Sequence, residues 1–392
     1  NVSSSNGLEK RPKLRFPGFD ESYRTTPLGE IASLVNRTDP KSNAPIMMLS
    51  AGNGFIMQSE KYSRDNAGQS LKKYILLKQG ELAYNHGASK AKQFGCCYEL
   101  TEPEARIPYV YHCFKINDHE YTPFIAMALN NAKMDKQLKR LVSSSVRMDG
   151  LLNISFEDYM SVTLHLPSST EQKHIADFLQ KIDERIAAQE KLLASLKKYK
   201  RGLVKALISG TVAFACSENK RWETVRLAEI FTISAGSDID RQNSSPTYST
   251  SYPYPVYANA LTNNGLYGYA NYFKVEGDSI TVSGRGEVGH AIARHCKYVP
   301  IVRLLSLVPK YEDDVDFFAY MINATSIYIE STGVPQLTSP QLGAVKVFRP
   351  PILEQKRISS LLLKIDAKIG NEERLTFYLE KIRSSMLQQL FI

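Results

Sequence analysis

The chain has 392 residues, of which 43% are hydrophobic and 23% charged, and this composition indicates two or three folded domains rather than a disordered polypeptide. No run of 18 apolar residues occurs, so neither a membrane span nor a membrane partner is expected. The formal net charge of +9 favours a polyanionic partner such as nucleic acid, although charge alone establishes only non-specific attraction.

Cysteine and histidine usage excludes several kinds of site. The five cysteines are odd in number and show no C-x-x-C spacing, which argues against a disulfide scaffold and a zinc site and fits a cytoplasmic protein. The seven histidines include no pair at metal-ligand spacing, and neither a Walker loop nor an Asn-Pro-Pro-Tyr motif occurs. We therefore expect no metal, no cofactor and no catalytic residue in this chain.

The chain opens with a lead-in segment over residues 1–19, whose first residues, NVSSSNGLEKRPK, lack the apolar core of a signal peptide and are expected to be floppy. Residues 20–166 form a first module (module 1). Its short β-branched and aromatic runs, such as KYILLKQGELAYNH, are punctuated by Gly, Asn and Asp, and a helical pattern begins at Thr122. Module 1 is therefore predicted to be a mixed α/β domain.

Module 1 carries a cluster of side chains suited to nucleic acid. Amides, hydroxyls and imidazoles on a loop above a rigid strand can read base edges, and lysines can contact phosphate. Taken singly, a residue of this kind is more often an ordinary surface residue. The candidates are Asn85, His86, Ser89, Lys90 and Lys92, with Lys72 and Lys73 nearby.

Residues 167–209 are predicted to form one long helix that begins after Pro167, where Ser168 and Glu171 match a capping box. A helix of about 40 residues is roughly 60 Å long, too long to be buried in one small domain, so it needs a partner helix. Apolar residues recur at heptad spacing and form a seam. The seam residues are Ile175, Leu179, Ile182, Ile186, Gln189 and Leu196.

Residues 210–349 form a second mixed α/β module (module 2), which opens as module 1 does: Trp222, Leu227 and Ile230 align with Tyr23, Leu28 and Ile31. Gly284 to Gly289 match the dinucleotide pattern G-x-G-x-x-G, but the residues that follow read as a strand, so we predict a Gly-rich hairpin. Arg285 on this hairpin either reaches outward to DNA or is a solvated turn residue. The DNA-binding candidates of module 2 are Tyr257, Asn259, Asn263, Arg285 and Arg294.

Residues 350–392 repeat the first helix. EQKRISSLLLKIDAKI from Glu354 matches EQKHIADFLQKIDERI from Glu171 at nine of sixteen positions, so the protein is built twice. We expect the two helices to pair antiparallel as a coiled coil that separates the modules, with Gln189 and Glu372 either fixing the register or lying at an exposed edge. The second seam consists of Ile358, Leu362, Ile365, Ile369, Glu372 and Leu379.

The arrangement of two variable modules, each followed by a helix opening with Glu-Gln-x-x-Ile, resembles the specificity (S) subunits of type I restriction-modification systems. The most specific segments are PKLRFPGF, LPSSTEQKHIADFLQKIDERI, YPVYANALTNNGLYGY, PPILEQKRISSLLLKIDAKI and SSMLQQLFI. The resemblance implies an α+β fold with two target recognition domains and a pseudo-twofold repeat.

The resemblance also implies a non-catalytic function. Each target recognition domain would read one half of a bipartite asymmetric site in double-stranded DNA, and the helices would set the spacing between the halves and dock the partner subunits. Those partners would be two modification (methyltransferase) subunits and the restriction/translocase subunits, which would carry S-adenosylmethionine, ATP and Mg. The alternative is a coiled-coil adaptor that presents two protein-binding modules without DNA specificity.

Overall fold

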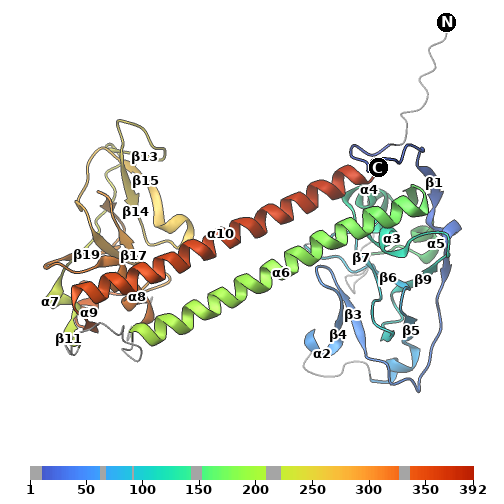
Figure 1. Ribbon diagram of the computed structural model, residues 1–392, viewed down its shortest axis with the longest axis horizontal. Helices are drawn as coiled ribbons and strands as arrows, with labels where there is room; N and C mark the ends of the chain where they lie inside the picture. Colours follow the sequence, from blue (N-terminus) through green and yellow to red (C-terminus); the bar gives the residue numbers. More distant parts are fainter. Residues whose placement is uncertain (1–10, 62–67, 91, 143–151, 209–221, 326–335) are drawn as a thin grey trace, which may run out of the picture. The chain divides into compact units, whose positions relative to one another are not determined.

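The computed structural model describes residues 11–61, 68–90, 92–142, 152–208, 222–325 and 336–392. The chain divides into two compact units: unit 1 contains Asn1–Gln189 with Leu375–Ile392, and unit 2 contains Glu190–Arg374. There are two long helices, α6 (Ser169–Ile208) and α10 (Ile352–Leu390), and each belongs to unit 1 with one part and to unit 2 with the other (Figure 1). The predicted α+β class with two repeated modules is confirmed. None of the helices described is long and apolar enough to cross a membrane.

Unit 1 consists of short strands with small helices at their ends. Its sheets have the strand orders β2-β9-β6-β7, β5-β8, β3-β4 and β1-β10. The elements of module 1 are β1 (Arg24–Pro27), α1 (Leu28–Ile31), β2 (Ala32–Leu34), β3 (Met47–Ser50), β4 (Gly54–Met57), α2 (Gln58–Lys61), the 3-10 helix η1 (Gly68–Lys73), β5 (Ile75–Lys78), β6 (Leu82–Asn85), β7 (Cys96–Glu99), β8 (Glu104–Ile107), β9 (His112–Ile116), α3 (Thr122–Leu129), α4 (Ala132–Leu141), α5 (Phe156–Met160) and β10 (Thr163–Leu166).

Unit 2 repeats this plan, with sheets ordered β12-β19-β16-β17, β13-β15-β14-β18 and β11-β20. The elements of module 2 are β11 (Glu223–Arg226), α7 (Leu227–Ile230), β12 (Phe231–Ala235), β13 (Ser244–Ser245), β14 (Tyr254–Tyr257), η2 (Thr262–Gly265), β15 (Leu266–Ala270), β16 (Ser279–Val282), β17 (Ala291–Arg294), β18 (Val299–Pro300), β19 (Leu305–Pro309), α8 (Val315–Ala324), α9 (Ser339–Gly343) and β20 (Lys346–Arg349).

The repeat extends to strand register. In unit 1 the first and last strands of the module pair with Arg24 opposite Leu166, and in unit 2 Glu223 lies opposite Arg349. These are the residues that the sequence repeat aligns. The predicted Gly-rich hairpin is also confirmed, because β16 and β17 flank residues 284–289 and pair antiparallel. A hairpin offers no helix N-terminus for a pyrophosphate, so this segment is not a dinucleotide loop.

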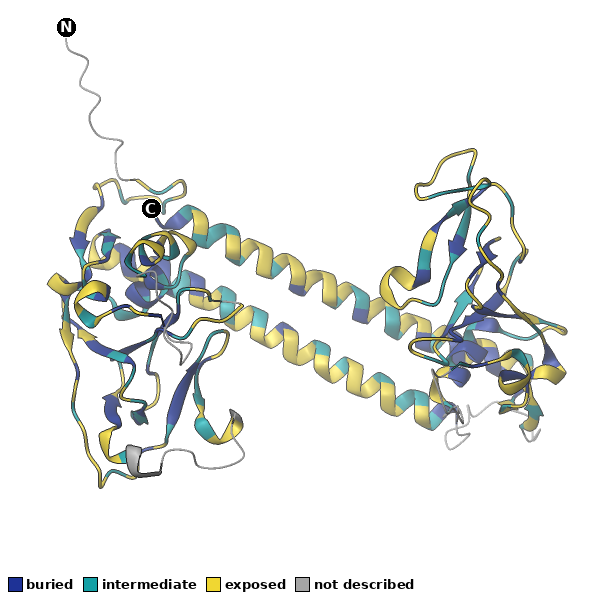
Figure 2. Cartoon of the chain, turned by 180° about the vertical axis from the view of Figure 1, so that it is seen from behind, coloured by how far each residue is buried: buried dark blue, intermediate teal, exposed yellow. Residues whose placement is uncertain are grey.

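Each unit has its own core. In unit 1 the sheet residues Tyr84 and Phe114 pack with Phe124 of α3, and Ile175 and Leu179 of α6 complete the cluster. In unit 2 the corresponding cluster joins Phe231, Phe317 and Phe318 with Ile358 and Leu362 of α10. Buried positions of the two long helices concentrate toward their ends (Figure 2). Burial against a module therefore anchors each helix end.

The two long helices run antiparallel within unit 2. Lys197 of α6 forms an ion pair with Glu373 of α10 at 2.6 Å, and Lys200, further along α6, pairs with the earlier residue Asp366 at 2.5 Å. In unit 1 Arg383 of α10 pairs with Asp183 of α6. Every seam residue is buried or half-buried, and Gln189 is only 4% exposed, which does not fit an exposed edge for that residue. The seam residues are Ile175, Leu179, Ile182, Ile186, Gln189, Leu196, Ile358, Leu362, Ile365, Ile369, Glu372 and Leu379.

The predicted lead-in is ordered over its second half. The backbone N–H of Leu14 donates to the carbonyl of Gln389 at 3.0 Å, and the ring of Phe16 meets Phe178 edge-on at 5.5 Å between centroids. Arg15 donates two hydrogen bonds of 2.8 Å to the carboxylate of Glu171. The prediction of a floppy segment concerns residues 1–13, of which residues 1–10 lie outside the described part of the chain, and it stays a prediction.

The predicted capping box of Ser168 and Glu171 at the start of α6 forms only in part. The hydroxyl of Ser168 accepts a hydrogen bond from the Glu171 backbone N–H at 3.4 Å, as the capping box requires. The Glu171 carboxylate, however, accepts from Arg15 and from the hydroxyl of Tyr23 at 3.2 Å. The reciprocal half of the box is replaced by contacts that hold the segment leading into module 1 against the helix.

Candidate nucleic-acid interface

The first two residues of the Glu-Gln-x-x-Ile motif attach each long helix to its module. Glu171 accepts from Tyr23 in unit 1, and Glu354 accepts from the indole N–H of Trp222 at 3.1 Å in unit 2. The next residue is a fully buried glutamine in both units. The motif therefore fixes the module on the helix, which is a structural role.

The buried glutamines make the same pair of contacts. In unit 1 Gln172 donates to the carbonyl of Pro167 at 3.0 Å and accepts from the backbone N–H of Tyr121 at 2.9 Å. In unit 2 Gln355 donates to the carbonyl of Pro350 at 2.9 Å and accepts from the backbone N–H of Asp314 at 2.8 Å. A buried amide must be satisfied in this way, and the contact also fixes the start of α3 or α8.

The turn after β6 presents the module 1 candidates. Asn85 accepts a hydrogen bond from the backbone N–H of Gly87 at 2.9 Å, and the Ser89 hydroxyl accepts from the backbone N–H of Lys92 at 3.0 Å. Such local side-chain to backbone bonds fix the shape of a turn. They hold Ser89 and Lys90 exposed to solvent, where DNA could reach them.

Two candidates from the same turn point inward. His86 is 4% exposed, with its ring 5.0 Å from that of His112, and the ammonium group of Lys92 donates to the carbonyl of Asn130 at 2.6 Å. A side chain that reads a base edge must reach the solvent. The structure therefore places His86 in the core. Lys92 holds the turn against the end of α3.

Lys72 and Lys73 are exposed at the end of η1. The ammonium group of Lys73 lies 5.8 Å from the ring centroid of Tyr109, close enough for a weak cation–π contact. Both lysines remain available for phosphate, and they come from a different element than Lys90. The exposed cations among the module 1 candidates are therefore Lys72, Lys73 and Lys90.

Arg294 of module 2 is buried and packs against the half-buried ring of Tyr257. The guanidinium lies 3.7 Å from the Tyr257 ring centroid, donates to the Thr281 hydroxyl at 2.9 Å and donates to the carbonyl of Asn264 at 2.7 Å. Arg294 is 7% exposed, and its burial lowers the pKa of the guanidinium. As the structure places it, Arg294 supports the loop of η2 from beneath and does not face solvent.

Asn259 joins two loops at one edge of module 2. Its amide donates to the carbonyl of Val302, and its side-chain oxygen accepts from the backbone N–H of Gly284 at 2.8 Å. Gly284 is required here, because a Cβ at this position would lie 2.9 Å from the carbonyl oxygen of Arg303. The hairpin and the loop around Arg303 are therefore in direct contact.

This edge carries exposed guanidinium and amide groups. Arg285 is exposed and donates through Nε and Nη2 to the side-chain oxygen of Gln336 at 3.2 and 2.9 Å. Val302 and Arg303 have φ values of 51° and 60°, and Asn263 has 51°. A β-branched residue in the left-handed region is strained, and such strain is typical of functional loops. Guanidinium and amide groups are also the groups that read bases.

Sequence reasoning missed Arg303 and Gln336. Neither belongs to a motif, and 51 residues separate Gln336 from the arginine that it binds. Asn263 and Arg285 were predicted and are exposed, whereas Tyr257 and Asn259 are half-buried supports. The interface offered by module 2 thus consists of Asn263, Arg285, Arg303 and Gln336, and their contact with DNA stays a prediction.

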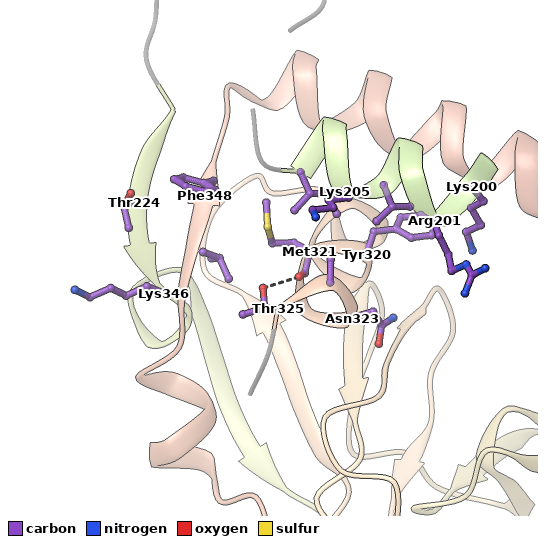
Figure 3. A pocket seen from close by; sticks show the side chains of 14 residues that line it. Lys200, Arg201, Lys205, Thr224, Tyr320, Met321, Asn323, Thr325, Lys346 and Phe348 are labelled. Atoms are coloured by element: carbon purple, nitrogen blue, oxygen red, sulfur yellow. Dashed lines mark hydrogen bonds between the residues drawn. The ribbon is translucent and has the colours of Figure 1, made fainter. Parts of the chain in front are cut away.

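Unit 2 also contains a groove of about 800 Å³ (Figure 3). Lys200, Arg201 and Lys205 of α6 form one side, and Tyr320 and Met321 belong to α8. Lys346 and Phe348 come from β20 (Figure 3). We call it the α6–α8 groove, and its lining residues are Lys200, Arg201, Val204, Lys205, Ile208, Thr224, Tyr320, Met321, Asn323, Ala324, Thr325, Lys346, Val347 and Phe348.

No group of three or more His, Cys, Asp or Glu side chains suited to a metal ion occurs within the parts of the chain that the structure describes. The cysteines with described positions, Cys96, Cys97, Cys113 and Cys296, are free thiols. Burial raises the pKa of the Cys96 thiol to about 11, which makes this thiol unreactive at neutral pH.

Comparisons with known proteins match this architecture. The model of the family described as type I restriction modification DNA specificity domain matches residues 72–198 and 219–381, which is most of the chain. A solved S subunit of a type I restriction-modification system from M. genitalium has a similar fold. It covers 97% of this chain and 99% of its own, with a TM-score of 0.63 and 17% identity.

Curated relatives match part of the chain. A protein of Mycoplasma pneumoniae named as type I specificity subunit S.MpnORF507P is 25% identical over 51% of this chain and 54% of its own length. A protein of Methanocaldococcus jannaschii named as type I restriction enzyme MjaX specificity subunit is 24% identical over 70% of this chain and 68% of its own. The chain thus spans about half the length of the first of these relatives.

Proposed function

Because the chain belongs to the family of type I restriction modification DNA specificity domains, we propose that it supplies DNA sequence specificity to a type I restriction-modification complex. Each module reads one half of a bipartite, asymmetric site in double-stranded DNA. The observation that carries this proposal is a repeated framework bearing two different polar loop clusters. Two different readers on one repeated scaffold suit an asymmetric site.

The proposed recognition domains are residues 20–166 and 210–349. In module 1, Ser89 and Lys90 contact DNA with help from Lys72 and Lys73; in module 2, Asn263 and Arg285 do so. These residues are exposed. Arginine and asparagine pair bidentately with guanine and adenine, and lysine contacts phosphate. Asn85, Lys92, Tyr257, Asn259 and Arg294 act indirectly, by fixing the loops that carry the readers.

The helices over residues 167–209 and 350–392 set the spacing between half-sites and dock two modification subunits. The restriction and translocase subunits join that core. The chain itself is non-catalytic and binds no cofactor, and S-adenosylmethionine, ATP and Mg act on the partner subunits, in the cytoplasm.

Mapping methylated adenines across a genome tests the proposal. Cells that express this chain with its modification partner are compared with cells that express the partner alone. A split motif that appears only with the chain is the expected result, and it would also give both half-sites. A well-formed complex that adds no new methylated motif would contradict the proposal and leave the protein-binding adaptor as the better account.

A further inference from the structure

The α6–α8 groove of unit 2 has a counterpart in unit 1. Thr163, Leu164 and His165 of β10 correspond in the repeat to Lys346, Val347 and Phe348 of β20, and Phe391 corresponds to Ile208. These residues line the same place in each unit, but the space measures about 150 Å³ in unit 1 and about 800 Å³ in unit 2. Something fills the space in unit 1.

The neighbouring helices correspond as well. Gln172 binds the backbone N–H of the residue before α3, and Gln355 binds that of the residue before α8. Counted from these two residues, Tyr121 and Asp314, the position of Asn130 at the end of α3 corresponds to that of Asn323 in α8. Asn323 exchanges two 2.8 Å hydrogen bonds with the backbone of Ala291, and Asn130 makes the same pair of contacts with Cys97.

Helix α4 occupies the space in unit 1. Its residues Met134 and Leu138, four apart, are 3% and 2% exposed and pack in the unit 1 core. Gln137 exchanges hydrogen bonds of 2.8 and 2.9 Å with the backbone of Thr163. Lys133 donates to the carbonyl of Phe391 at 2.7 Å. Helix α4 therefore connects β10, the last strand of module 1, to the C-terminal end of α10.

The stretch from Thr325 to Thr338 is ten residues shorter than the corresponding stretch from Ala132 to Ser155. Ten is also the length of α4. Among the residues of unit 2 that the structure describes, no element corresponds to α4.

The groove has the chemistry of a helix acceptor for an acidic partner. Val204, Ile208 and Val347 give it an apolar lining, and the aromatic ring of Phe348 remains 41% exposed. Its charged lining residues are all cations, namely Lys200, Arg201, Lys205 and Lys346. A DNA backbone would gain nothing from an apolar lining, whereas an amphipathic helix would bury its apolar face there.

We propose that the α6–α8 groove binds an acidic amphipathic helix of about three turns from a protein partner, in the position that α4 occupies in unit 1. Two apolar residues spaced four apart enter the groove as Met134 and Leu138 do. Carboxylates on the partner helix face Arg201, Lys205 and Lys346. This binding activity goes beyond DNA reading and does not depend on it.

A peptide with the sequence of α4, made acidic, tests the proposal directly. It carries residues 131–142 with Lys136, Lys139 and Arg140, which are exposed on α4, each changed to glutamate. A lactam bridge stabilises it, since a helix this short is marginal alone. Fluorescence anisotropy measures its binding to the full chain. Changing Met134 and Leu138 of the peptide to serine should weaken binding at least about tenfold, as loss of two apolar anchors requires.

Charge reversal in the protein provides the second measurement. Arg201→Glu with Lys205→Glu should weaken binding of the acidic peptide about threefold or more, as two partly exposed ion pairs predict. Lys191→Glu, an exposed change on the same helix outside the groove, should leave affinity unchanged. The unaltered basic α4 peptide should bind at least about threefold more weakly than the acidic one.

Two results would overturn the proposal. One is failure of the acidic peptide to bind a chain whose thermal unfolding is normal, because the groove would then be filled by the chain itself or closed in solution. The other is equal binding by the serine-substituted peptide or by the Arg201→Glu, Lys205→Glu variant, because attachment would then lie elsewhere. Neither result depends on whether the chain determines a methylated DNA motif.

Discussion

In unit 1 a buried glutamine of α6 joins the long helix to the start of α3, and in unit 2 the equivalent glutamine of α10 joins it to the start of α8 by the same bonds. Beside these joints the units differ. A helix fills the space next to α3, and a groove remains next to α8. The comparison teaches that the joints between module and helix are held constant, while loops and filling elements are free to change.

An acidic residue near each joint supports this interpretation. Glu120 of unit 1 pairs with Arg24, which lies on the first strand of the module. Asp313 of unit 2 pairs bidentately at 2.9 Å with Arg349, which lies on the last strand. Arg24 lies on the first strand of the β1–β10 pair, and Arg349 lies on the last strand of the equivalent β11–β20 pair. The ion pair is thus kept although the arginine has moved across the pair, so the contact itself is what the framework requires.

The largest predicted effect comes from the core positions that the repeat aligns, Leu179 of unit 1 and Leu362 of unit 2, which are 1% and 0% exposed. Leu179→Ala and Leu362→Ala should each lower the free energy of unfolding by about 2–5 kcal/mol, through lost burial and the cavity left behind. Hydrogen exchange read by mass spectrometry should localise each loss to its own unit. Equal loosening of both units by either variant would contradict two separate cores.

A somewhat smaller effect is expected at the joints. Gln172→Leu and Gln355→Leu keep the volume but leave a buried carbonyl and a buried backbone N–H without partners, at a cost of about 1–3 kcal/mol each. Backbone exchange should rise at Tyr121 in the first variant and at Asp314 in the second. Unchanged exchange at these two amides would show that the joints do not hold α3 and α8.

Two arginines of module 2, Arg294 and Arg285, are expected to differ in role, because one supports a loop and the other reads bases. Arg294→Met removes hydrogen bonds made by a buried charged group and should cost about 1.5–3 kcal/mol of stability. Arg285→Ala changes an exposed side chain and should alter stability by no more than about 0.5 kcal/mol. In the assembled methyltransferase, however, Arg285→Ala should relax the base preference in one half-site by about 1–3 kcal/mol. Similar stability losses in both variants would remove the distinction between support and reader.

The smallest effect concerns pH and arises at His295 of unit 2. Burial of His295 acts to lower its pKa, but hydrogen bonds to Asp278 at 2.9 Å and Asp316 at 3.1 Å outweigh it and raise the pKa above 6.5. The stabilisation is therefore complete below about pH 6.5 and is lost as pH rises through the folded pKa.

Because the imidazole is half exposed, solvent screening keeps this contribution below about 1 kcal/mol. Thermal unfolding at pH 5.5 and 8.5 should show that His295→Gln reduces the difference between the two conditions. The control His174→Gln alters an imidazole that packs edge-on against the ring of Phe19. A pH dependence that survives His295→Gln unchanged would rule out this origin.

Local sequence patterns predicted the parts of the molecule that depend on local periodicity. The heptad spacing from Ile175 to Leu196 correctly marked buried or half-buried positions of α6, and the glycines between 284 and 289 correctly marked a hairpin. The change in repeat offset along the chain also includes the ten residues by which the stretch from Thr325 to Thr338 is shorter than its counterpart in module 1. The sequence alone does not explain this difference, because only the structure shows that α4 fills a space in unit 1.

Contacts between distant residues could not be predicted in this way. Arg15 binds Glu171 across 156 residues, a contact that no local sequence pattern indicates. His86 and Arg294 have the side chains of DNA readers, but aromatic neighbours cover them. Burial of this kind is set by the tertiary fold, and polarity alone does not reveal it.

The most direct test of two independent readers on one framework is a module exchange. Residues 211–349 are replaced with the second module of another family member, and methylated adenines are mapped with the same modification partner present. The account predicts that one half of the recognised site changes while the other half, read by module 1, is retained. A change in both halves would contradict it.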